Sequence, residues 1–194
     1  MTARVFSTWN PNALGHGLAL EQGNLVITTL ENSLSNARKV LGTLPKGASP
    51  GFYETVFWSV PRVSLGDNVA TGVALPDSPL DQAVGADAKS CGYYPATGEI
   101  IYGGVVLTTT AAAVDPIPER TDIGVYLIFQ TTHAYVNFIV NGTWVYEVDL
   151  GTGGGVWVPA QTIAGGNAGE TSSYTRFGGG GVAFNHPRII APPT

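Results

Sequence analysis

Residues 136–150 read VNFIVNGTWVYEVDL, and they carry the clearest structural signal in the sequence. Two runs of β-branched and aromatic residues flank Asn141-Gly142. Asn-Gly favours a type I′ turn, in which both central residues have positive φ, so we predict a β-hairpin with a two-residue loop. The turn sets the register of the two strands and predicts four cross-strand pairs: Val140 with Thr143, Ile139 with Trp144, Phe138 with Val145, and Asn137 with Tyr146.

Alternation of side chains along each strand predicts that both faces of this hairpin are apolar. Val136, Phe138, Val140 and Val145 would lie on one face; Ile139, Trp144, Tyr146 and Val148 would lie on the other. A hairpin with one face in water should show polar residues on that face. Either the hairpin lies between two layers of its own domain, or a partner covers its outer face.

The composition of the 194-residue chain argues against several classes of function. Charged residues make up 12% of the chain, about half the usual share, whereas hydrophobic residues make up 44%. The net charge of −5 and the lack of any Lys/Arg run predict no binding to nucleic acid. The longest apolar run is far short of the ~20 residues that a membrane helix needs. This composition favours a chain with much of its surface packed against neighbours.

The sequence also predicts the compartment in which the chain is synthesised and the state of its single cysteine. Residues 1–30 lack the basic, apolar and small-residue regions of a signal peptide, so we expect synthesis in the cytoplasm. Cys91 is the single cysteine, which leaves no intramolecular disulfide and no cysteine-based metal site. We predict that it is a buried and inert thiol.

The rest of the chain reads as short strands separated by turn signals every ~8–12 residues, which predicts an all-β sandwich or barrel with little helix. The expected strands are residues 18–20, 25–28, 52–60, 69–75, 92–94, 98–107, 122–130 and 182–184, with a short edge strand at 156–159. Residues 35–42 fit a short helix or a charged strand. Trp9-Asn10-Pro11 reads as a turn and residues 165–175 as a loop. Residues 108–118 read as an exposed loop or as an arm laid on a partner. Gly72 suggests a close approach between two backbones.

Acidic and histidine residues are candidates for catalysis and for metal binding. Glu147 and Asp149 share a strand face, as in some glycoside hydrolases, but Thr152 stands where such a motif has its third acid. His16, His133 and His186 are too widely spaced for a zinc site. Asp77, Asp81 and Asp87 share a loop without the spacing of a known calcium motif, which leaves calcium binding open. We therefore predict no catalytic residue, no metal site and no cofactor.

Aromatic residues are the better candidates for binding. The candidate residues are Ile139, Trp144, Tyr146 and Trp157. Exposed aromatic rings stack on sugars or fill pockets of partner proteins. The alternative for these side chains is ordinary packing in the core of a β-sandwich.

An ordered set of short motifs resembles the SPRY family. The motifs are Trp9-Asn10-Pro11, Gly51-Phe52-Tyr53-Glu54-Thr55-Val56, Gly72-Val73-Ala74, Val84-Gly85-Ala86-Asp87, Ser90-Cys91-Gly92-Tyr93-Tyr94, Asp122-Ile123-Gly124-Val125, residues 136–142, Phe177-Gly178 and Phe184-Asn185-His186-Pro187. The sequence departs from the family at Leu127-Ile128, where the family has Leu-Asp, and in Gly-rich insertions near Gly151 and Gly165. The compact form is most similar to SPRY-like proteins of bacteriophages and bacteria.

The resemblance implies a fold and a class of function. The fold would be a two-sheet antiparallel β-sandwich, a concanavalin A-like jelly roll, formed as one domain over residues 1–194 with its core at 9–187. The function would be a non-catalytic structural or adhesive module of a phage particle, in the capsid decoration, tail or baseplate. It would pack against other virion proteins as a homo-oligomer or in many copies. A module that binds host-surface glycans is the alternative, and a glycoside hydrolase is a more distant one.

Overall fold

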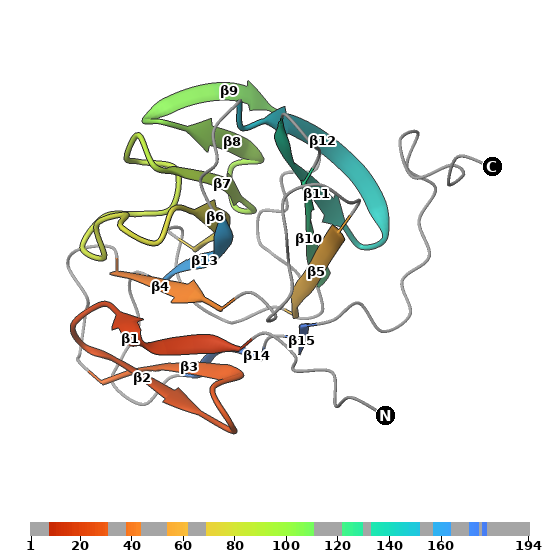
Figure 1. Cartoon of the computed structure of the whole chain (residues 1–194). Coiled ribbons are helices and arrows are strands. Elements are labelled where there is room, and N and C mark those ends of the chain that lie inside the picture. Colours follow the sequence, from red (N-terminus) through yellow and green to blue (C-terminus); the bar gives the residue numbers. More distant parts are fainter. Residues whose placement is uncertain are drawn as a thin grey trace.

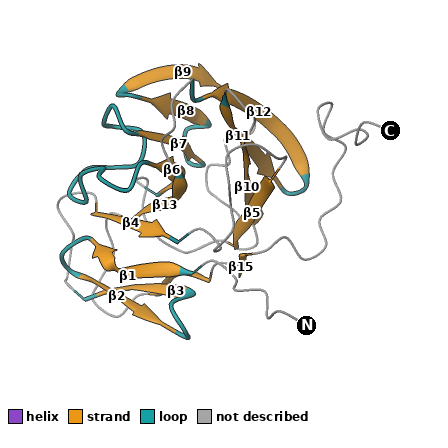
Figure 2. Ribbon diagram, in the orientation of Figure 1, coloured by secondary structure: helices purple, strands orange, loops and turns teal. Residues whose placement is uncertain are grey.

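The computed structural model describes residues 8–30, 38–43, 54–61, 69–110, 122–129, 133–151, 157–163, 171–174 and 176–177. The regular elements in these ranges are all strands (Figure 2). They are β1 (Trp9–Leu14), β2 (Leu18–Glu21), β3 (Val26–Thr29), β4 (Arg38–Gly42), β5 (Glu54–Pro61), β6 (Ala70–Ala74), β7 (Ser90–Tyr94), β8 (Glu99–Tyr102), β9 (Val105–Thr109), β10 (Asp122–Phe129), β11 (Ala134–Val140), β12 (Thr143–Asp149), β13 (Val158–Ile163), β14 (Thr171–Tyr174) and β15 (Arg176–Phe177). None of the described residues forms a helix that could span a membrane.

The strands form three antiparallel sheets (Figure 1). The large sheet has seven strands in the order β1-β4-β13-β6-β7-β8-β9. The second sheet has five strands in the order β12-β11-β10-β5-β15, and the small sheet has three in the order β14-β3-β2. Strands β9 and β12 therefore end their sheets, and Figure 1 shows both at the same end of the molecule. The expected all-β, sandwich-type fold is confirmed.

The main core lies between the large and second sheets, where alternate residues of each strand point inward. The large sheet contributes Val73, Cys91, Tyr93 and Ile100, and the second sheet contributes Val125, Leu127, Val136 and Phe138. The rings of Tyr93 and Phe138 meet across the layers with centroids 5.9 Å apart. Cys91 is fully buried, as predicted, and burial raises the pKa of its thiol.

Loop 75–89 covers the outer face of the large sheet. Ala74, Val84 and Ala160 belong to one apolar cluster there. Two glycines permit close backbone approaches, Gly92 between β7 and this loop and Gly72 between β6 and β7. A Cβ on Gly92 would lie 2.6 Å from the carbonyl oxygen of Val84, and one on Gly72 would lie 2.0 Å from the carbonyl oxygen of Cys91. The close backbone approach predicted at Gly72 is confirmed.

The 136–150 hairpin forms with the predicted turn, since Asn141 and Gly142 have φ of 49° and 79°. Val140 pairs with Thr143 and Ile139 with Trp144, as predicted. Beyond that point the prediction was wrong, because a bulge at Val145 shifts the register. Phe138 pairs with Tyr146 and Asn137 with Glu147. A bulge places two residues opposite one, so every later side chain of β12 changes face.

Three segments differ from their sequence-based assignments, and in a fourth the structure decides between two alternatives. The predicted turn at Trp9 is the start of β1, and residues 171–174 of the predicted loop form β14, which pairs with β3. The segment 98–107 is not one strand, because Gly103 and Gly104 turn the chain between β8 and β9. In the ambiguous segment 35–42, residues 38–42 are strand β4.

The predicted edge strand at residues 156–159 was also wrong. Strand β13 lies between β4 and β6, at the interior of the large sheet, even though it contains Pro159. Proline normally avoids central strands because it has no N–H for the ladder. Here Gly42 on the neighbouring strand makes room for the ring, since a Cβ on Gly42 would lie 2.8 Å from Pro159 Cβ. The predicted strand at 182–184 lies outside the described residues.

Candidate functional site

The four aromatic and aliphatic residues predicted to bind do not share one surface. Ile139 and Trp157 are buried, and Tyr146 packs partly buried against the main core. Only Trp144 remains open, with 41% of its surface exposed. Burial of Ile139 within the single chain supports the hypothesis that the hairpin lies inside its own domain.

Tyr146 and Trp157 are turned away from the surface for different reasons. The bulge at Val145 turns Tyr146 to the same face as Phe138, away from Trp144. Trp157 precedes β13 and meets Tyr102 edge-on, with ring centroids 6.2 Å apart. Both rings therefore pack in the core, which is the alternative that the sequence offers for these side chains.

Trp144 is held in place by a buried amide. Its indole Nε1–H donates a hydrogen bond of 2.9 Å to Oδ1 of Asn137, and Nδ2 of Asn137 donates to Oε2 of Glu147 at 3.1 Å. Asn137 is fully buried, so its amide is satisfied only through such contacts. The indole is therefore fixed on the sheet surface before any ligand arrives.

We expect Asn137→Ala to lower the free energy of unfolding by about 1–3 kcal/mol, because it removes a buried amide and the partners of two side chains. Trp144→Phe, which removes one donor from a half-exposed ring, should cost less than about 1.5 kcal/mol. Urea unfolding of the two variants and the wild type measures both values. Equal stability of Asn137→Ala and the wild type would contradict the role given to this amide.

The two acids considered for glycosidase chemistry do lie on one strand face, as predicted, but both are hydrogen bonded. Glu147 accepts from Asn137, and Asp149 accepts from Nδ1–H of His133 at 2.9 Å and from the backbone N–H of Gly151 at 2.8 Å. Within the described ranges, no three His, Cys, Asp or Glu side chains gather in a way that could hold a metal ion. Among the acids of loop 75–89, Asp87 pairs with Lys39 and Asp77 with Lys89.

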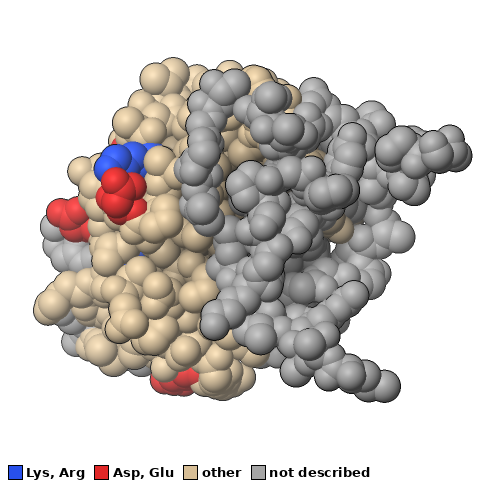
Figure 3. Space-filling model, viewed as in Figure 1, with Lys and Arg blue, Asp and Glu red and all other residues tan. Residues whose placement is uncertain are grey.

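Three of the five exposed large hydrophobic side chains in the described part of the chain lie next to one another on strand β9. Val105, Val106 and Leu107 are 62%, 48% and 42% exposed. We call Val105, Val106, Leu107 and Thr109 the β9 edge. Residues on both faces of the strand are open, and no other strand in the described part of the chain pairs with its outer side. Figure 3 shows few charged side chains on the described part of the surface in view.

Hydrogen bonds fix both ends of this strand. At its start, the backbone N–H of Gly104 donates to the carbonyl of Gly85 in loop 75–89, at 2.8 Å. At its end, the backbone N–H of Thr110 donates to the carbonyl of Gly98 at 2.9 Å. Tyr102 of the neighbouring strand β8 donates its hydroxyl to the carbonyl of Leu150, just after β12. The β9 edge is thus a firmly held strand.

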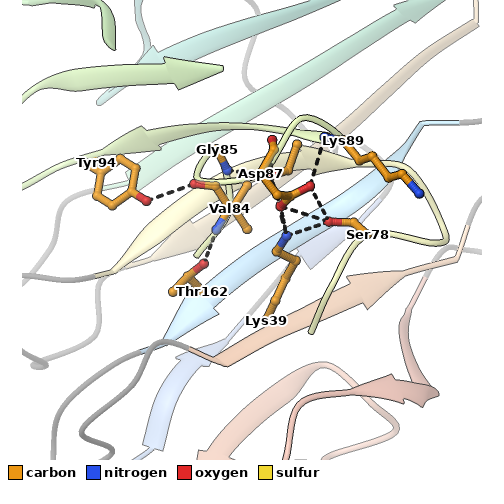
Figure 4. Close-up of polar contacts among 9 residues, drawn as sticks. Lys39, Ser78, Val84, Gly85, Asp87, Lys89, Tyr94 and Thr162 are labelled. Carbon is orange, nitrogen blue, oxygen red and sulfur yellow. Dashed lines mark hydrogen bonds and ion pairs between the residues drawn. The ribbon is translucent and has the colours of Figure 1, made fainter. Parts of the chain in front are cut away.

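Loop 75–89 contacts the turn before β9 through Gly85, and a buried ion pair anchors the loop itself (Figure 4). Nζ of Lys39 on β4 lies 2.5 Å from Oδ2 of Asp87, and the two side chains are 0% and 8% exposed. Nζ also donates to Oγ of Ser78 at 2.6 Å. The Ser90 hydroxyl donates to Oδ2 of Asp87 at 2.6 Å and accepts the backbone N–H of Gly85 at 2.7 Å. A chain of contacts therefore runs from β4 through Asp87, Ser90 and Gly85 to the start of β9.

Burial and pairing shift the titration of this cluster. Burial lowers the pKa of Lys39 below its ordinary value, although the Asp87 carboxylate opposes that shift. Burial acts to raise the pKa of Asp87, but hydrogen bonds from Lys39 and Ser90 outweigh it and hold the pKa below its ordinary value. The two side chains meet in the geometry of an ion pair, with little access to water.

Sequence reasoning missed the β9 edge because it joined residues 98–107 into one strand. The signal that could have revealed it is Gly103-Gly104 between two β-branched runs, since Gly-Gly is a hairpin turn sequence. The exposure itself has no signal in the sequence. A run of Val and Leu normally indicates a buried strand.

The arrangement of strands is similar to that of several solved structures. A human SPRY domain superposes with a TM-score of 0.61 over 83% of this chain and 94% of its own length, at 16% sequence identity. The fold is SPRY-like. The SPRY domain of human HERC1 (TM-score 0.60, 13% identity, 87% of this chain and 96% of that one) and the PSpry domain of TRIM65 (0.59, 13%, 87% and 89%) agree. No protein-family model and no curated protein matches the sequence. Within the SPRY-like fold, the β9 edge is one end of the large sheet.

Proposed function

We propose that this chain is a non-catalytic protein-recognition module that packs against partner proteins through the β9 edge. The observation that carries the proposal is the exposure of Val105, Val106 and Leu107 on a strand that hydrogen bonds fix at both ends. A rigid binding strand loses little conformational entropy when a partner docks. Exposed apolar surface of this kind marks interaction sites.

The chemistry of the edge favours a protein partner. An edge strand offers a row of N–H and C=O groups, and proteins commonly protect such edges with charged residues or proline. The sequence VVLTT of β9 contains neither. A partner strand that adds to the sheet would gain main-chain hydrogen bonds and cover the three apolar side chains, which is the β-augmentation mode of recognition.

A random-peptide display selection tests this proposal, with the chain immobilised at low density so that copies stay apart. We expect the wild type to enrich extended peptides rich in β-branched, uncharged residues. Val106→Asp should lose that enrichment, because it places a charge on the edge. Leu30→Asp, at another exposed apolar residue outside β9, should keep it. Enrichment that survives Val106→Asp would overturn the proposal.

We further propose that the module works in a phage particle, as a capsid-decorating, tail or baseplate protein present in several copies and synthesised in the host cytoplasm. The support is the low charged fraction of 12% together with an apolar edge suited to packing. Immunogold labelling of purified particles from the producing strain measures this directly. Particles without label, from cells that contain the chain, would place the module elsewhere.

A second candidate is recognition of host-surface glycans through Trp144. The observation that favours it is a half-exposed indole fixed by Asn137, since fixed aromatic rings stack well on sugars. A glycan array probed with the wild type and Trp144→Ala separates the two functions. Glycan binding that Trp144→Ala abolishes and Val106→Asp leaves intact would favour this candidate.

A further inference from the structure

We propose that the occupant of the β9 edge is a second copy of this chain, paired antiparallel about a two-fold axis that passes at Leu107. The proposal rests on the proposed function and names its partner. It places Leu107 of one copy opposite Leu107 of the other, and Val105 opposite Thr109. The two large sheets would then continue as one sheet across the axis.

The charge distribution suits self-pairing. Strand β9 carries no charged residue, so no like charges meet when it faces its own copy. The nearest charge on the adjacent strand is Glu99, which pairs with Thr109 at one end of β9. A two-fold axis at Leu107 puts the two Glu99 side chains at opposite ends of the joint. All facing pairs are therefore aliphatic or threonine side chains, which stabilise antiparallel strands.

The shape of the edge also selects a matching partner. The β8–β9 register shifts between Ile100 and Ile101, which leaves Leu107 as the extra residue of a bulge. A bulge increases the local twist of its strand. A second copy carries the same twist at the same residue. The two strands therefore have the same shape on both sides of the axis.

A charge-exchange experiment tests the pairing. Sedimentation of the wild type from ~1 to ~200 µM should show a monomer–dimer equilibrium. Leu107→Lys and Leu107→Glu should each weaken dimerisation at least ~10-fold, because two like charges then face one another. Mixing the two variants should restore dimers, since lysine then faces glutamate. Leu30→Lys should dimerise like the wild type.

Disulfide trapping tests the register. Leu107→Cys should form a disulfide-linked dimer under mild oxidation, because facing residues of antiparallel strands have Cα atoms ~4.5–5.5 Å apart, within disulfide range. Val105→Cys alone should not, since its own symmetry mate lies four residues along the strand, ~13 Å away. Val105→Cys with Thr109→Cys should cross-link again. Cys91 is buried, so we expect no disulfide-linked dimer from the wild type.

The outcomes separate this inference from the proposed function. Exchange between the Leu107 variants together with the trapping pattern supports self-pairing. A wild type that stays monomeric, or dimers unaffected by Leu107→Lys, overturns it. If the chain is monomeric but the peptide selection still depends on Val106, the recognition function stands with another partner. If neither assay depends on β9, both proposals fail.

Discussion

Replacing Gly72 with alanine is expected to lower the free energy of unfolding by about 3 kcal/mol or more, one of the largest effects of a single methyl group in this protein. The added Cβ would lie 2.0 Å from the carbonyl oxygen of Cys91 and 2.8 Å from Cα of Gly92. Both are backbone atoms of strand β7, so no side-chain rotation relieves the overlap. Strands β6 and β7 would have to move apart at the centre of the large sheet.

Thermal and urea unfolding measure this effect. Gly23→Asn is the matched control, because nothing lies within 4 Å of a Cβ at Gly23 and asparagine tolerates its φ of +69°. We expect the control to change stability by less than about 1 kcal/mol. If Gly72→Ala and Gly23→Asn unfold alike, the close contact between β6 and β7 is wrong.

Asp87→Asn is expected to cost about 3–5 kcal/mol at neutral pH, because it leaves the ammonium group of Lys39 buried without its counter-charge. Lys39→Met should also lower the free energy of unfolding, because it leaves the Asp87 carboxylate buried without its counter-charge. The double variant Lys39→Met/Asp87→Asn should be less destabilised than the sum of the two, since no buried charge remains. A strictly additive double variant would show that the two groups do not act as a pair.

The effect should depend on pH in a defined direction. The pKa of Asp87 lies below its ordinary value in the folded chain, so its contribution is complete above about pH 4 and is lost as the pH falls through the folded pKa. We therefore expect the wild type and Asp87→Asn to converge in stability at low pH. Lys89→Met, which breaks the exposed pair with Asp77, should change stability little at any pH.

The same substitution links stability to the candidate site. Asp87 holds Ser90, Ser90 holds the N–H of Gly85, and the carbonyl of Gly85 holds Gly104 at the start of β9. In Asp87→Asn, amide hydrogen exchange at Gly104 should therefore speed up more than at Thr110, which is tied to Gly98 instead. Equal changes at the two ends would mean that the ion pair supports the fold without positioning β9.

How far the fold follows from the sequence depends on the range of the interaction involved. The turn at Asn141-Gly142 was predictable because its backbone geometry is a property of those two residues. The close approach at Gly72 and the burial of Cys91 were also predictable, since each follows from residue type within a β-rich chain. Of the candidate site, only Trp144 was both predicted and found exposed.

The sequence by itself determined most of the strands, the hairpin turn and the all-β class, because these arise from local backbone preferences and alternation. Tertiary structure alone decided the bulge at Val145, the central place of Pro159 beside Gly42, and the exposure of Val105, Val106 and Leu107. Each of these depends on which strands become neighbours. A valine on a strand looks the same in sequence whether another sheet covers it or it lies beyond the edge of that sheet.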